Sequence, residues 1–305
     1  MHHTLTQAIE EISTVVLGKQ RQIRLALTCF LAQGHLLIED LPGIGKTTLA
    51  HCLAQVLGLD FTRVQFTSDL LPGDLLGVSV YEQRAGLFTF HPGPVFTQVL
   101  LADEINRATP KTQSALLEAM EERQVTVEGA TRSLEEPFFV IATQNPLEQA
   151  GTFALPESQK DRFLFRLAMG YPDAEAERSI LRKDTPGMRP DRLQPVMDGQ
   201  TLLDLQQQVR EVHVSEILLE YIRSILEMTR NNGQFLAGLS PRAGLALLRG
   251  AKSWAFGEGR EYVMPEDIHA VFPFVVTHRL TPATGQGSVR PDDMNELLAS
   301  VPVPV

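Results

Sequence analysis

The chain has 305 residues, a formal net charge of −10 and a pI of about 5.3. Its 43% hydrophobic and 21% charged content is typical of a globular protein, and its length is sufficient for two domains. An acidic surface repels nucleic acids and anionic membranes, which argues against a general polyanion-binding protein. No apolar run approaches the roughly 20 residues that span a bilayer. The first residues lack the pattern of a signal peptide, so we expect a cytoplasmic protein.

The first part of the chain predicts two helices and then a strand. Residues 5–16 and 20–33 carry apolar side chains at helical spacing, which is typical of amphipathic helices. Residues 35–39 then predict a strand. Cys29 and Cys52 each lie in an apolar helical stretch, so we expect buried free thiols, and two cysteines are too few for a disulfide framework.

The segment after this strand, Asp40-Leu41-Pro42-Gly43-Ile44-Gly45-Lys46-Thr47, is the most informative of the chain. A glycine-rich turn between a strand and a helix exposes successive backbone N–H groups at the positive end of the helix dipole, so such a turn binds phosphate groups. Lys46 would reach the β- and γ-phosphates of a nucleotide, and the Thr47 hydroxyl would bind Mg²⁺. The Walker A pattern has glycine where this chain has Asp40. The predicted nucleotide-binding residues of this segment are Pro42, Gly43, Ile44, Gly45, Lys46, Thr47 and Thr48.

Two further strands are predicted to end in polar residues that suit phosphate chemistry. Residues 99–102 form an apolar run followed by Asp103 and Glu104, and ligands bind at the carboxyl ends of strands in open α/β sheets. Asp103 would hold Mg²⁺, largely through water, and Glu104 would polarise the attacking water. After a strand at 138–142, the Asn145 amide could orient that water through a hydrogen bond. Taken singly, the acids could be a solvated strand end and Asn145 part of an Asn-Pro turn.

The order of the elements predicts an α/β fold with a second, helical domain. Helical patterns separate short apolar strands, which favours a parallel sheet with helices on both faces. From residue 173 onward only helical patterns follow, so we divide the chain into an α/β phosphate-loop core at 1–172 and a smaller all-α domain at 173–305. The tail from Thr281 is rich in Pro, Gly and Ser and is expected to be partly mobile. The remaining strands of the core are predicted at 62–66, 99–102, 138–142 and 163–168, with a helix at 111–122.

A family resemblance rests on five segments in combination: the phosphate loop, 103–107, 111–126, 142–146 and 155–163. Together these segments closely resemble the MoxR family of AAA+ ATPases, and the similarity extends over nearly the whole chain. Many members of that family have aspartate or another residue at the first Walker A position, as here at Asp40. Where the family usually has alanine and leucine, this chain has Ser158 and Lys160, for which we expect no functional consequence.

The resemblance implies roles for four polar residues outside the phosphate loop. Asn145 resembles the sensor 1 residue. Arg242 resembles the sensor 2 arginine, which would clamp ATP between the core and the helical lid. Arg162 resembles the arginine finger that reaches the nucleotide of the neighbouring subunit, with Arg166 as a second candidate. Surface ion pairs are the alternative for Arg162 and Arg242, although the position of Arg242 on the first turn of a predicted helix favours an anion.

The resemblance also implies an adenine contact and two β-hairpin insertions. Val16-Leu17-Gly18 resembles the segment that packs on adenine in related ATPases, which favours ATP as the nucleotide. The insertions are expected to contact partners, and plain surface hairpins are the alternative. Their strands are predicted at Val78–Tyr81 and Leu87–Phe90, and at Gln124–Val127 and Ser133–Leu134.

The resemblance implies an ATP hydrolase that works with Mg²⁺ as a ring, expected to be a hexamer. It would remodel or mature a protein complex as a chaperone, with a von Willebrand factor A-domain partner and a further protein client. A chelatase-type motor subunit that drives metal insertion is the nearer alternative, and a nucleic-acid-translocating motor is disfavoured by the acidic composition. The intact Asp103-Glu104 pair disfavours a non-hydrolysing adaptor. The eight histidines show no metal-ligand spacing.

Overall fold

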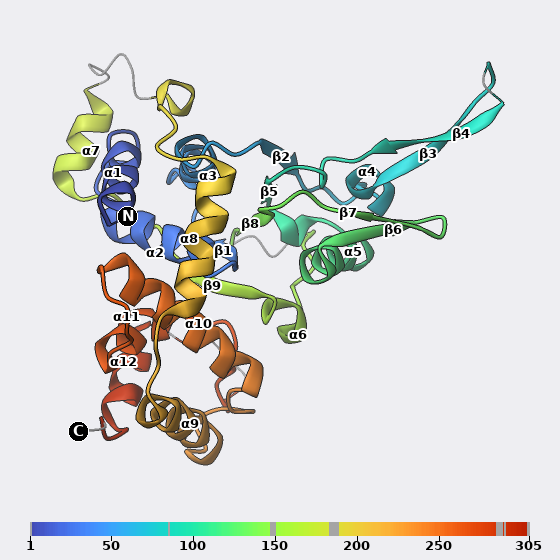
Figure 1. Cartoon of the computed structure of the whole chain (residues 1–305). Coiled ribbons are helices and arrows are strands. Elements are labelled where there is room, and N and C mark those ends of the chain that lie inside the picture. Colours follow the sequence, from blue (N-terminus) through green and yellow to red (C-terminus); the bar gives the residue numbers. More distant parts are fainter. Residues whose placement is uncertain are drawn as a thin grey trace.

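A computed structural model describes residues 2–84, 86–146, 151–182, 189–284, 289 and 291–303 (Figure 1). Its centre is a five-stranded sheet in the order β2-β5-β8-β1-β9, and every pairing in it is parallel. This confirms the predicted α/β class, and β1, the strand that precedes the phosphate loop, lies second from one edge. The strands are β1 (His35–Glu39), β2 (Phe61–Gln65), β5 (Val99–Asp103), β8 (Phe139–Gln144) and β9 (Phe163–Leu167).

Both faces of the sheet are buried, because side chains alternate along each strand. Leu36 and Ile38 of β1 belong to one hydrophobic cluster, and Leu37 between them belongs to another on the opposite face. The first cluster is covered by α1 (His2–Ser13), α2 (Gln20–Leu31) and α3 (Lys46–Val56), and the second by α5 (Pro110–Glu122). The helix predicted at 5–16 ends at Ser13, three residues earlier than predicted. A turn with Gly18 at a φ of 66° follows before α2 begins.

Two hairpins project from the sheet on the side of α5 (Figure 1). The first follows α4 (Pro72–Leu76) and pairs β3 (Gly77–Glu82) with β4 (Leu87–Pro92), and the second pairs β6 (Gln124–Val127) with β7 (Ala130–Ser133). Both were expected, but β7 begins at Ala130 and not at Ser133. The reason is that Glu128 and Gly129 have φ angles of 52° and 79° and close a two-residue turn that suits the twist of a hairpin.

The remaining elements are helical and include one that was not expected. The helix α12 (Pro291–Ala299) lies in the tail predicted to be partly mobile, and its buried Met294 and Leu298 pack in the hydrophobic core that includes α11. Residues 285–288, 290 and 304–305 of that tail lie outside the described residues. The other elements are η1 (Ile105–Arg107), α6 (Glu157–Lys160), α7 (Ala174–Leu181), η2 (Pro190–Arg192), α8 (Gly199–Glu211), α9 (Glu216–Asn231), α10 (Pro241–Gly257) and α11 (Pro265–Val276).

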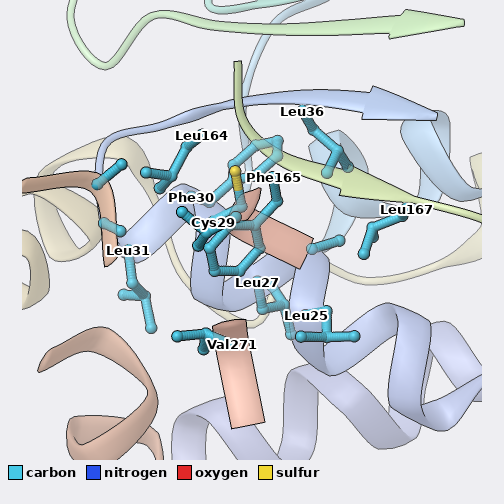
Figure 2. Packing of buried hydrophobic residues seen from close by; sticks show 14 of the residues in the cluster. Leu25, Leu27, Cys29, Phe30, Leu31, Leu36, Leu164, Phe165, Leu167 and Val271 are labelled. Carbon is cyan, nitrogen blue, oxygen red and sulfur yellow. The ribbon is translucent and has the colours of Figure 1, made fainter. Parts of the chain in front are cut away.

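The helical part packs directly on the sheet core. Figure 2 shows Cys29 and Phe30 of α2 among Phe165 of β9 and Val271 of α11, so three distant segments share one cluster. At Gly250 of α10, a Cβ would lie only 3.0 Å from the Phe165 ring, and glycine therefore allows α10 to approach β9 closely. Both cysteines are buried and free, as predicted. In the part of the chain that the structure describes, no helix is long and apolar enough to cross a membrane.

Candidate active site

The phosphate loop connects the end of β1 to the start of α3 (Figure 1). Gly43 and Gly45 have φ angles of 82° and 90°, a left-handed conformation that residues with a Cβ rarely adopt. A Cβ built on either glycine would meet nothing within 4 Å, so the backbone angle, and not a lack of space, requires glycine here. The open space beside both glycines leaves the backbone of the loop accessible to a ligand.

Asp40 occupies the position where the Walker A pattern has glycine, and its side chain stabilises the loop. Its carboxylate accepts hydrogen bonds from the backbone N–H of Leu41 at 2.7 Å and of Gly170 at 2.6 Å, which ties the loop to the segment after β9. The backbone oxygen of Asp40 accepts a hydrogen bond from Lys46 Nζ at 2.5 Å. Partial burial lowers the pKa of Lys46, and the Asp40 carboxylate is the first of three nearby carboxylates that oppose this shift.

Asp103 is buried at the carboxyl end of β5, and both of its oxygens have partners. Oδ1 accepts a hydrogen bond from the Thr143 hydroxyl at 2.6 Å, and Oδ2 accepts one from Arg63 Nη2 at 2.7 Å. Thr143 lies on β8 and Arg63 on β2, the two strands that flank β5 in the sheet. The neighbouring strands therefore fix the carboxylate at the sheet edge where the phosphate loop lies.

Glu104 directly follows β5 and has a φ of 57°, a left-handed conformation that is uncommon without glycine and recurs at functional sites. Its backbone N–H donates to the Thr143 hydroxyl oxygen at 2.8 Å. Its carboxylate accepts a hydrogen bond from Gln65 Nε2 at 2.7 Å and lies 3.1 Å from Arg107 Nε. Thr143 thus orients both acids, and this residue was not singled out from the sequence. Gln65 and Arg63, both on β2, were also not singled out from the sequence.

One cavity of about 340 Å³ brings the three predicted motifs together. The phosphate loop forms one side, the two acids after β5 form another, and Asn145, the residue after β8, completes it. Thr47 and Asp103 both line this cavity, and hydroxyl and carboxylate oxygens are the ligands that Mg²⁺ prefers. The residues present therefore fit Mg²⁺ beside a triphosphate. The lining residues are Pro42, Gly43, Gly45, Lys46, Thr47, Thr48, Asp103, Glu104 and Asn145.

A second cavity, of about 400 Å³, adjoins the first through shared residues of the phosphate loop. Its walls are mainly apolar, and Tyr171 and Leu181 are 74% and 75% exposed, so a planar base could cover them. Gly18 does not line it, but a Cβ there would lie 3.0 Å from the Cβ of Ala176, so glycine allows the close approach of α7. The apolar lining consists of Val15, Val16, Leu17, Pro42, Ile44, Tyr171, Pro172, Ile180 and Leu181.

The four residues at 171–172 and 180–181 were missed because Tyr171-Pro172 was interpreted only as a domain boundary. For Ile180 and Leu181 the signal was present in the sequence, because they are apolar residues at the end of a short helix, α7. Lys19 also contributes, since its Nζ donates to the backbone oxygen of Tyr171 at 2.6 Å and joins the start of α2 to this segment. The predicted contact segment at Val16 and Leu17 does line the cavity.

Arg162 and Arg242 lie together, away from both of these cavities. Their guanidinium groups bind the two carboxylate oxygens of Glu121, at 2.9 Å for Arg162 and 2.7 Å for Arg242. Arg242 also lies 3.7 Å from Asp161. Arg166 differs from both, because its Nε lies 2.6 Å from Glu39 at the end of β1, within the sheet.

In this structure Arg242 therefore does not lie where it could clamp ATP within its own chain. The cause is the packing of the lid, because α10 contacts α2 and Gly250 brings it against Phe165 of β9. This packing places the start of α10 beside the end of α5, where Glu121 lies, and not beside the phosphate loop. Arg242 thus shares a surface with Arg162.

Comparisons with known proteins bear on this arrangement. Residues 35–165 match the family model described as "ATPase family associated with various cellular activities (AAA)", and residues 227–299 match "AAA lid domain". Chaperone MoxR1 of Mycobacterium tuberculosis is 41% identical over 287 residues, which cover 91% of this chain and 76% of that protein. The chain belongs to the MoxR family of AAA+ ATPases. This confirms the resemblance inferred from the five segments.

Other matches extend the MoxR-family likeness to full length. Protein MoxR of Paracoccus denitrificans is 34% identical over 332 residues, covering 99% of this chain and 97% of that protein. The YeaC protein of Bacillus subtilis is 44% identical over 308 residues, covering 100% and 96%. A solved crystal structure from Cytophaga hutchinsonii, 37% identical, has a TM-score of 0.90 and covers 100% of this chain and 96% of its own. The domain boundary at 172/173 stays a prediction.

Proposed function

We propose that this MoxR-family chain hydrolyses ATP with Mg²⁺ as a subunit of a ring, expected to be a hexamer. The observation that carries the proposal is the single cavity in which the phosphate loop, the two acids after β5 and Asn145 meet. The adjoining apolar cavity supports a nucleotide over a bare phosphate compound, because it offers a base-sized space beside the loop. Family membership supports an ATPase as the general class.

Each residue of the cavity has a chemical role in this proposal. Loop N–H groups and Lys46 hold the β- and γ-phosphates, while Mg²⁺ at Thr47 and Asp103 would neutralise charge on the phosphate oxygens. Glu104 accepts a hydrogen bond from a water molecule, and Asn145 fixes its orientation. The water oxygen bonds to the γ-phosphorus as the bond to the bridging oxygen breaks. The products are ADP and inorganic phosphate, and the water proton leaves through Glu104.

We propose that a second subunit completes the site, because none of the described residues that line the cavity of one copy is an arginine. On another surface of the chain, Arg162 and Arg242 share the carboxylate of Glu121, and Arg242 also lies 3.7 Å from Asp161. We propose that they reach the γ-phosphate held by the next subunit. In phosphoryl-transfer enzymes, an arginine supplied in this way accelerates the reaction by roughly 10³–10⁵. Arg166 is not required in this scheme.

The work of the ring is proposed to be the remodelling of a protein complex, with a von Willebrand factor A-domain partner. The name Chaperone MoxR1 of a relative supports a chaperone role. The β3–β4 hairpin supports protein contact, since Tyr81 and Phe88 are 52% and 68% exposed and their rings lie 5.3 Å apart. Arg132 of β7 lies over the Phe90 ring of β4 at 3.8 Å and joins the two hairpins.

Phosphate release from Mg-ATP by the purified chain tests the proposal, together with sedimentation with and without nucleotide. Arg162→Ala and Lys46→Ala should each be inactive. A mixture of the two should regain activity, because a Lys46→Ala subunit supplies Arg162 to the intact phosphate loop of a neighbouring Arg162→Ala subunit. Arg223→Ala is the matched control, since Arg223 is exposed on α9 and, among the described residues, pairs with just Glu220 and Glu227 of its own helix. A monomeric wild type that releases no phosphate would refute the proposal.

A further inference from the structure

A third cavity, of about 160 Å³, opens on the surface that carries Arg162 and Arg242. It is unusual in its charge, because five arginines line it against only two carboxylates, Glu121 and Asp161. His35 also lines it, but burial lowers the pKa of this imidazole to about 4, so it stays uncharged near neutral pH. The five arginines are Arg123, Arg162, Arg242, Arg249 and Arg279.

Four of the five guanidinium groups have partners in the chain. Arg162 and Arg242 share Glu121, and Arg123 lies 3.6 Å from Glu136. Arg279 is 5% exposed and has a structural role: it binds the Asp161 carboxylate at 2.6 Å and donates to the backbone oxygens of Asp161 and Phe163.

Arg249 is the exception among the five. Within the described ranges, no hydrogen bond or ion pair holds its guanidinium group, and the residue as a whole is exposed, although partial burial lowers the pKa of this group. Arg249 follows Arg242 by seven residues on α10, which is two helical turns, so the two side chains project from the same face of the helix. A cluster of like charges is unfavourable unless an anion enters it, and guanidinium groups match the geometry of phosphate oxygens.

We propose that Arg249 is a third arginine that contacts the terminal phosphate of the nucleotide held by the neighbouring subunit, together with Arg162 and Arg242. This inference rests on the proposed function and extends it to a residue that the sequence did not single out. The positive charge of the cavity supports this proposal. Its five arginines face only two carboxylates of the chain, and a triphosphate would supply further negative charges. The rival occupant is a carboxylate of the neighbouring subunit, which would make Arg249 an assembly contact only.

The test uses the full-length chain with Arg249→Gln, Arg249→Lys and the control Arg223→Gln. Four properties are measured for each variant: phosphate release at saturating Mg-ATP, binding of a fluorescent ATP analogue, sedimentation with nucleotide, and the unfolding temperature. Arg249→Gln should lower turnover at least about 10-fold, while ring assembly and unfolding temperature stay those of the wild type. Arg249→Lys should restore part of the turnover, because it keeps the positive charge. Arg223→Gln should change none of the four.

Mixing gives the readout that a structural role could not produce. Lys46→Ala subunits keep Arg249, so in a random one-to-one ring with Arg249→Gln about a quarter of the interfaces join an intact phosphate loop to an intact arginine set. Turnover of the mixture should therefore rise above that of either variant alone. Turnover of Arg249→Gln within twofold of the wild type would overturn the inference, as would loss of turnover that follows loss of the ring. Failure of this mixture alone, while the Arg162→Ala mixture recovers, would reject Arg249 and leave the proposed function intact.

Discussion

Replacing His35 should change how the stability of the protein depends on pH. His35 lies on β1 and is 8% exposed. Its Nδ1 accepts a hydrogen bond from the backbone N–H of Val140 at 2.9 Å, and its Nε2 lies 3.2 Å from the backbone oxygen of Met120. These contacts fit the neutral ring with its proton on Nε2. Burial is the main cause that lowers the pKa from 6.5 to about 4, and the nearby charges of Arg123 and Arg249 contribute to this shift.

The sign and size of the effect follow from this pKa. In the unfolded chain this histidine binds a proton below about pH 6.5, whereas in the folded protein it binds one only below about pH 4. The free energy of unfolding therefore falls as the pH decreases through this window. The full contribution is about 3 kcal/mol, of which about 2 kcal/mol is lost between about pH 7.5 and about pH 5. His278 is also buried, and burial lowers its pKa too, so the wild type should lose more than this amount.

Urea unfolding of the wild type and of His35→Asn at the two pH values provides the measurement. Asparagine can still accept the Val140 hydrogen bond, so the variant should fold with a constant loss of about 1–2 kcal/mol from the contact to Met120. Its pH-dependent loss should be about 2 kcal/mol smaller than that of the wild type. His213→Asn, at an exposed histidine, is the matched control and should keep the wild-type dependence. Equal pH dependence of the wild type and His35→Asn, or a His35 proton resonance that titrates near pH 6.5, would refute the reasoning.

Four further predictions concern the nucleotide site. Lys46→Ala should abolish ATP binding in calorimetry, and tight binding by this variant would contradict the assignment of the phosphate loop. Glu104→Gln should bind ATP but hydrolyse it at least about 100-fold more slowly; near-normal phosphate release would remove Glu104 from the mechanism. Gly45→Ala should lower the free energy of unfolding by about 1–2 kcal/mol, because its φ is 90°, and an unchanged unfolding temperature would count against strain there. Leu181→Asp should weaken ATP binding about 10-fold but leave inorganic triphosphate binding unchanged, and equal losses for both ligands would argue against a base contact.

The features that the sequence predicted correctly are those that depend on a short stretch of chain. The phosphate loop requires glycines at fixed places between a strand and a helix, and Gly43 and Gly45 have the left-handed angles that this geometry needs. The strands of the core were predicted because runs such as 99–102 are buried on both faces of a parallel sheet. Asp103 and Asn145 follow their strands to the same cavity for the same reason.

The features that the sequence did not predict depend on contacts between distant segments. The position of Arg242 is set by how α10 packs on α2 and β9, and no local pattern records that packing. The roles of Thr143 and Gln65 depend on which strands flank β5, an order that the sequence does not state. Tyr171 joins the apolar cavity only because the chain returns to the phosphate loop after β9, where Gly170 binds Asp40.

The buried guanidinium group of Arg279 has a mechanical consequence. It belongs to the segment that follows α11, yet its bonds to Asp161, Phe163 and Leu164 fasten that segment to the residues on either side of Arg162. A tilt of the segment that carries Arg279 would therefore be expected to move Arg162 as well. In an assembled ring, a tilt triggered by the nucleotide of one subunit would shift the charge presented to the next. The nucleotide state of one subunit would then affect the site of the next through the position of Arg162.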